Sequence, residues 1–180
     1  MSYPVRRLRG RYRSLALIET FNAVILLPGM FWFFGWPLTV ANLSGAVACG
    51  VLLLAGAAYW ATKVRQLDER TMLPRGLGAF AVLRPIGWVL SLGALLLVVV
   101  LRGPNGIAWL PGLGTAVLAV LEQINYFHVQ LSHDNPSDLA RLFRSGLRSS
   151  KLARDLAARR TGTPPPGLRF PDPGAGQPLH

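Results

Sequence analysis

Polar side chains crowd the stretch 120–130, which is otherwise an apolar part of the chain. It reads Val-Leu-Glu-Gln-Ile-Asn-Tyr-Phe-His-Val-Gln, so a carboxylate, three amides, a phenol and an imidazole stand where a membrane-length segment would place hydrocarbon. Ionisable groups at membrane depth are costly, so they usually have partners and often serve a function. The candidates for binding or acid–base chemistry are Glu122, Gln123, Asn125, Tyr126 and His128.

Three more polar residues, Glu19, Asn22 and Arg84, interrupt other apolar segments. Glu19 and Asn22 are three residues apart, as are Glu122 and Asn125, so each pair lies on one helix face. At ~1.5 Å per residue, Glu19, Arg84 and Glu122 are roughly 8, 10 and 15 Å below the basic ends of their segments. We therefore expect one shared polar site between helices, with Arg84 paired to Glu122 or Glu19.

The spacing of these residues argues against several known chemistries. A di-iron carboxylate site needs Glu-x-x-His on two helices, whereas this chain has Glu-x-x-Asn twice. His128 lies about 240° around the helix from Glu122, so the two side chains do not point toward one metal and no metal site is predicted. We expect no other cofactor either. The sequence has no Ser-His-Asp grouping, P-loop or Rossmann fingerprint. Three interpretations stay open: a structural ion pair, a binding or transport site, and a catalytic site with Glu122 or Glu19 as acid or base.

The elements that position these residues are four long apolar segments. The chain is 51% hydrophobic and 15% charged, against about 25% charged residues in a soluble domain. Each segment is long enough to cross the ~30 Å core of a bilayer as a helix. We predict an all-α integral membrane bundle of four transmembrane helices, with spans at about 14–36, 38–62, 77–101 and 107–132. The pair Gly45 and Cys49 would allow a close approach between helices, and Pro28 should kink the first span.

The basic residues predict the orientation. Five Lys or Arg lie in a basic arm at 1–13, four in the loop 63–76 and eight after residue 132, which is 17 of the 19 in the chain. The positive-inside rule places that side, and both termini, in the cytoplasm. The net charge of +11 is therefore assigned to topology and anionic lipid headgroups rather than to nucleic acid. The expected location is the cytoplasmic (inner) membrane of a bacterium, since Arg, Ala and Gly are abundant and Lys is rare.

The tail divides into two parts. Asn135 and Pro136 suit a helix N-terminus, and 133–160 should form a cytoplasmic amphipathic helical segment. Over 137–148 this helix would either pack on the bundle or lie in the plane of the anionic inner leaflet, with Arg141, Arg144 and Arg148 facing the lipid surface. Residues 161–180 are rich in Pro and Gly, which predicts disorder.

The run Glu-x-Ile-Asn-Tyr-Phe-His, followed by Gln-Leu and an acidic Asn-Pro turn over 122–136, resembles the closing segment of a family of small bacterial four-span membrane proteins with no assigned activity. The resemblance implies a membrane fold and no particular reaction. The function expected from the residues is binding of a lipid, a small ligand or partner membrane subunits at an inner-leaflet polar site, with a homo-oligomer as one form of assembly. The alternatives are a membrane-embedded enzyme acting on a lipid, and a transporter subunit.

Overall fold

Helices make up most of the described chain. The computed structural model describes residues 3–102, 106–129 and 149–162. The elements are α1 (Tyr3–Phe21), the π-helix η1 (Asn22–Leu26), α2 (Leu27–Phe33), α3 (Val40–Glu69), α4 (Leu77–Val100), α5 (Leu110–Phe127) and α7 (Lys151–Thr161). One isolated antiparallel bridge joins Val129 to Ser149.

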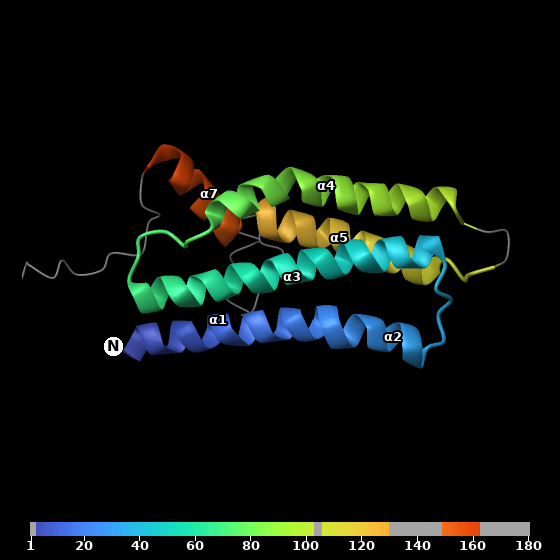
Figure 1. The fold of residues 1–180 in the computed structure, drawn as a ribbon, viewed down its shortest axis with the longest axis horizontal. Coiled ribbons are helices and arrows are strands. Elements are labelled where there is room, and N and C mark those ends of the chain that lie inside the picture. Colours follow the sequence, from blue (N-terminus) through green and yellow to red (C-terminus); the bar gives the residue numbers. More distant parts are fainter. Residues whose placement is uncertain (1–2, 103–105, 130–148, 163–180) are drawn as a thin grey trace, which may run out of the picture.

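The long helices lie side by side and alternate in direction (Figure 1). The helix α3 is central, because it packs against α1, α4 and α5, while α4 also packs against α5. The first turns of α1 and α4, the last turns of α3 and α5, and all of α7 therefore gather at one end of the bundle, at the left of Figure 1. The basic stretches at 5–13 and 63–76 lie at this end, so we refer to it as the basic end.

Three helical stretches are long and apolar enough to cross a membrane: Val5–Phe33, Val40–Glu69 and Leu77–Val100. The prediction of an all-helical chain is therefore confirmed, and three of its helices are long and apolar enough to span a membrane. The helix α5 runs alongside them with 18 residues, about 27 Å at 1.5 Å per residue. Its last two turns carry the polar run singled out in the sequence, which lowers its mean hydropathy.

The first span differs from its prediction in two ways. The basic arm is not separate, because α1 begins at Tyr3 and runs on into the span. Arg9 of this stretch forms an ion pair of 2.9 Å with Asp68 of α3. At Pro28, where a kink was expected, the structure has the π-turn η1 just before the proline, in which the Leu27 N–H donates to the Asn22 carbonyl. Proline has no N–H to continue the regular pattern, and a π-turn is one way of accommodating that loss.

Small residues allow α3 and α5 to pack closely. A Cβ on Gly45 would overlap the Gly112 carbonyl and the Thr115 hydroxyl. Cys49, one turn further along α3, is buried in the same core. The close approach expected at Gly45 and Cys49 is thus a contact between α3 and α5. In lipid, burial of apolar surface gives little driving force for helix association. Helices therefore associate through close van der Waals packing at small residues.

The helix α3 is longer than the predicted second span. It continues past Thr62 to Glu69 and ends at Arg70, which has the left-handed φ of 52°. The loop expected at 63–76 therefore shrinks to the residues between Glu69 and Leu77. As a result Lys63 is placed on a helix, where it is buried rather than solvated.

Candidate functional site

A small cavity lies at the basic end, where α1, α3, α5 and the start of α7 meet. Its volume is about 60 Å³, which is room for ordered water or one small polar group. The lining residues are Arg11, Leu15 and Glu19 of α1, Tyr59 and Trp60 of α3, Asn125 and Tyr126 of α5, and Ser150, Lys151 and Leu152 at the start of α7. Charged, polar and aromatic groups from four segments therefore surround one space, which we call the Glu19 cavity.

Glu19 is held by only one of its oxygens. The Tyr126 hydroxyl donates a hydrogen bond to Glu19 Oε1, while Glu19 Oε2 is buried and has no hydrogen-bond partner among the described residues. Gly56 makes room for this contact, because a Cβ there would overlap the Tyr126 ring. A buried acceptor without a donor costs about 1–3 kcal/mol. A ligand that brings a donor to Glu19 Oε2 would recover that cost.

A second carboxylate lies close to the first. Glu122 is one turn before Tyr126 on α5, so both side chains project from the same face. It accepts a hydrogen bond of 3.5 Å from Asn125 Nδ2, and it is close enough to Glu19 for the two carboxylates to repel each other. The structure thus brings Glu19, Glu122, Asn125 and Tyr126 together, while Asn22 lies further along in η1.

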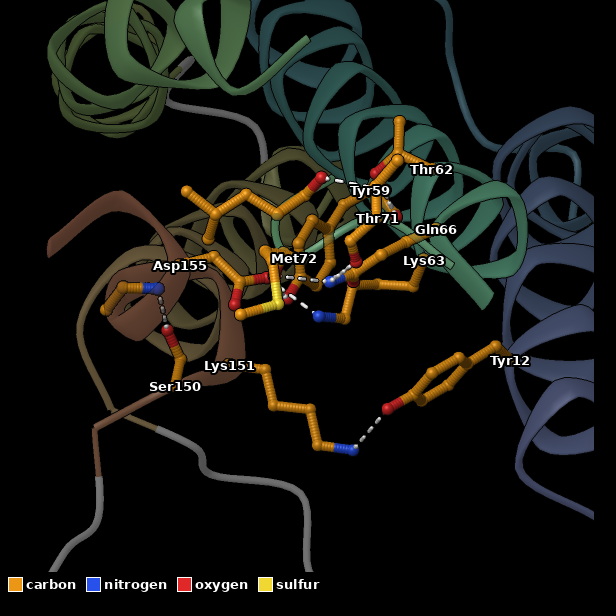
Figure 2. Close-up of polar contacts among 12 residues, drawn as sticks. Tyr12, Tyr59, Thr62, Lys63, Gln66, Thr71, Met72, Ser150, Lys151 and Asp155 are labelled. Carbon is orange, nitrogen blue, oxygen red and sulfur yellow. Dashed lines mark hydrogen bonds and ion pairs between the residues drawn. The ribbon is translucent and has the colours of Figure 1, made fainter. Parts of the chain in front are cut away.

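Cationic side chains border the same cavity. The Lys151 ammonium lies 4.9 Å from the centroid of the Tyr12 ring and 5.6 Å from that of Trp60, and 3.5 Å from the Tyr12 hydroxyl oxygen (Figure 2). The two rings stack with centroids 5.4 Å apart. Arg11 also lines the cavity. The site therefore carries negative charge on one wall and positive charge at its border, an arrangement that suits a dipolar ligand.

Arg84 belongs to a different group of residues. Its Nη2 lies 3.4 Å from His128 Nδ1, and the Trp88 indole donates a 3.0 Å hydrogen bond to His128 Nε2. Both neighbours can only donate, and a neutral imidazole has one acceptor nitrogen, so His128 can accept a hydrogen bond from one of them at a time. Among the described residues no ion pair joins Arg84 to Glu122 or Glu19, and the expected pairing is not found.

Helix geometry explains why the polar residues separate. Successive side chains on α5 point about 100° apart, so Glu122 and Tyr126 face α1 while Gln123 faces α4. Gln123 Nε2 donates a 2.8 Å bond to the carbonyl of Arg84. A Cβ on Gly87 would overlap the Gln123 amide, so this glycine gives the amide its space. Gln123 ties α5 to α4 and takes no part in the Glu19 cavity.

The sequence did not reveal the ion pair that docks α7. Lys63 Nζ lies 3.0 Å from Asp155 Oδ2, and each side chain is only 5% exposed. The Tyr59 hydroxyl donates a second bond of 2.8 Å to the same oxygen (Figure 2). Charged residues are rarely this buried unless they are paired. The spacing of Leu152, Asp155 and Leu156, which places one acid between two leucines on a helix face, is the signal that could have marked Asp155 as buried.

Ser150 joins α7 to the end of α5. Its hydroxyl accepts a 3.0 Å bond from the N–H of Ala153, which caps α7, and it donates a bond to the carbonyl of Tyr126. The helix α7 then buries Leu152, Asp155, Leu156 and Ala158 against the bundle. The expected lipid-facing helix over 137–148, with Arg141, Arg144 and Arg148, lies outside the described residues.

No group of three or more His, Cys, Asp or Glu side chains that could hold a metal occurs within residues 3–102, 106–129 and 149–162. No family model, no curated protein and no solved structure matches the chain.

Proposed function

We propose that the protein is a multi-pass protein of the cytoplasmic membrane that binds a zwitterionic, amine-bearing phospholipid headgroup in the Glu19 cavity. In this proposal α5 is the fourth span, and both termini lie in the cytoplasm. Two features support it. The helices alternate in direction, and the charge-rich ends of α1, α3 and α4 share one side, as the positive-inside rule requires of a cytoplasmic face.

The observation that carries the proposal is the unpartnered Glu19 Oε2. A primary ammonium can donate a charge-assisted hydrogen bond to this oxygen, and such bonds are roughly twice as strong as neutral ones. The rings of Tyr59 and Trp60 line the same cavity, and aromatic faces attract cations. The basic side chains of Arg11 and Lys151 line the same cavity, and their charge is opposite to that of the headgroup's phosphate.

The size of the cavity adds selectivity among headgroups. About 60 Å³ admits an ammonium group, whereas the three methyl groups of choline would add bulk and remove every donor N–H. A glycerol headgroup has no positive charge for Glu19. We therefore expect phosphatidylethanolamine to bind more tightly than phosphatidylcholine or phosphatidylglycerol.

Native mass spectrometry of the detergent-purified protein, titrated with these three lipids, tests the proposal. Loss of a charge-assisted bond in Glu19→Gln should weaken phosphatidylethanolamine binding by about tenfold or more. Glu69→Gln, which removes a carboxylate that pairs with Arg75 outside the cavity, is the matched control and should have no effect. Equal affinity of Glu19→Gln and the unaltered protein would refute the site, as would equal binding of phosphatidylcholine. A mass change in the bound lipid would favour the alternative of a lipid-modifying enzyme.

A second candidate function is assembly with another copy of the chain. The helix α2 leaves Trp32 89% and Phe33 80% exposed, and an apolar groove of about 750 Å³ lies between α2 and α3. Lipid chains would cover these surfaces in a monomer, and a neighbouring helix would cover them in an oligomer. The mass of the protein–detergent complex, measured by light scattering, distinguishes the two. A dimer that dissociates in Trp32→Ala would support assembly.

A further inference from the structure

A second pocket, of about 460 Å³, lies between the first turns of α4 and the last turns of α7. It is on the α4 side of the bundle and shares no lining residue with the Glu19 cavity. Three arginines line it, Arg84 of α4 with Arg159 and Arg160 of α7. We call it the arginine pocket.

The arginine pocket has a large excess of positive charge. No carboxylate lines it, and within the described residues none of its three arginines forms an ion pair. Asp155, the one acid on α7, is already bound to Lys63 on α3. Arg84 contacts the neutral His128, which contributes no negative charge. Three guanidinium groups therefore surround a space with nothing in the described chain to neutralise them.

The backbone of α4 is shaped to receive one of these arginines. A Cβ on Gly78 would lie 3.0 Å from Arg159 Nη1 and 3.3 Å from Nη2. The glycine lets the guanidinium group come close to the first turn of α4. The guanidinium group of Arg159 thus lies beside the first turn of α4 while its side chain stays exposed.

An exposed apolar strip continues from the arginine pocket along α4. Val82 lines the pocket and is 61% exposed, and Ile86 and Val89 are 45% and 74% exposed. Their spacing of four and three residues places them on one helix face. Cationic groups at the membrane interface above an apolar strip match the two halves of a phospholipid, a charged headgroup and its acyl chains.

We propose that the arginine pocket binds the phosphate of an anionic phospholipid of the cytoplasmic leaflet, with an acyl chain along Val82, Ile86 and Val89. Arginine suits this role because its planar group can donate two parallel hydrogen bonds to a phosphate. Basic pockets beside transmembrane helices on the cytoplasmic side are typical sites for anionic headgroups. A free phosphate shares the headgroup chemistry, but it would gain nothing from the apolar strip.

The test uses the full-length protein in mild detergent, with lipid binding measured by native mass spectrometry. The ligands are phosphatidylglycerol, phosphatidylcholine and the water-soluble glycerol 3-phosphate. Phosphatidylglycerol should bind, and the double variant Arg159→Gln, Arg160→Gln should weaken that binding by about tenfold or more. The control Arg6→Gln, Arg7→Gln removes the same charge from two exposed positions on α1 and should leave the affinity unchanged.

Further variants and ligands separate the explanations. Replacing Arg159 and Arg160 by lysine keeps the charge but loses the bidentate geometry, so an intermediate affinity is expected. Glu19→Gln should not alter phosphatidylglycerol binding, which separates this site from the Glu19 cavity. Equal weakening by the α1 control pair would show general surface attraction and overturn the proposal. Equal binding of phosphatidylcholine would refute charge recognition, and glycerol 3-phosphate binding as tightly as the lipid would refute the role of the apolar strip.

Discussion

Asp155→Asn is the most informative single change, because it removes a charge and keeps the shape. Asparagine can still accept the hydrogen bond from Tyr59, so the variant mainly strands the Lys63 ammonium. Both side chains of the pair are only 5% exposed. Removing one partner of a buried ion pair typically costs about 3–5 kcal/mol, because the other charge is left without compensation.

This cost is comparable to what holds α7 in place. Leu152 and Leu156 are the two large apolar side chains that α7 buries. Each fully buried leucine contributes about 1.5–3 kcal/mol, and ordering the helix offsets part of that sum. Releasing α7 would return the Lys63 ammonium to water. The free energy lost by undocking α7 would be similar to the cost of leaving that ammonium buried without its partner. We therefore expect Asp155→Asn to detach α7 while the bundle of α1, α3, α4 and α5 stays folded.

Hydrogen exchange measured by mass spectrometry reports whether α7 is detached. In Asp155→Asn the amides of 151–161 should lose protection, while those of α4 keep theirs. Asp68→Asn is the matched control, because its ion pair with Arg9 has side chains 32% and 37% exposed, and such pairs contribute about 0.2–1 kcal/mol. Adding Lys63→Met to Asp155→Asn should restore part of the protection, since no charge is then stranded. Protection in Asp155→Asn as high as in the control would refute the reasoning.

Two further predictions concern packing and topology. Gly45→Ala should destabilise the detergent-extracted protein by about 1–3 kcal/mol, because its Cβ would overlap α5. A Cβ on Gly93 would have no atom within 4 Å, so the control Gly93→Ala should not lower the midpoint of thermal unfolding. Equal midpoints for the two variants would contradict this account. In a Cys49→Ala background, a cysteine at Ile107 should react with an impermeant thiol reagent in intact cells, while one at Asp68 should not; the reverse pattern would refute a cytoplasmic basic end.

The helical membrane architecture could be predicted because each of its signals is local. The length of each apolar segment indicates a span. The alternation between strongly basic connections and connections with at most one basic residue implies antiparallel helices, as the structure has them. Even the close approach at Gly45 follows from residue size alone. Helix ends were predicted less well. The helix α3 continues for seven residues beyond Thr62, because burial of Lys63 and neighbouring residues against α7 extends it, and that burial depends on a segment distant in sequence.

The partner of Arg84 could not be predicted from its depth in the membrane alone, since a contact also depends on the direction in which each side chain points around its helix. Glu19, Arg84 and Glu122 do occupy the same half of the bundle. The direction of each side chain around its helix depends on helix order, which the sequence does not specify. The helix α3 lies between α1 and the pair formed by α4 and α5. On α5, Glu122 lies on the side of Glu19, while the groups near Arg84 are His128 and Gln123 on the α4 side.

The same geometry gives α7 a part in both proposed sites. Ser150, Lys151 and Leu152 at its start close the Glu19 cavity on the α1 side. Arg159 and Arg160 at its other end complete the arginine pocket on the α4 side. Asp155 lies between them and holds the helix to α3. Because a ligand stabilises the state that binds it, lipid in either site should favour docked α7, and detaching α7 through Asp155→Asn should weaken both sites together.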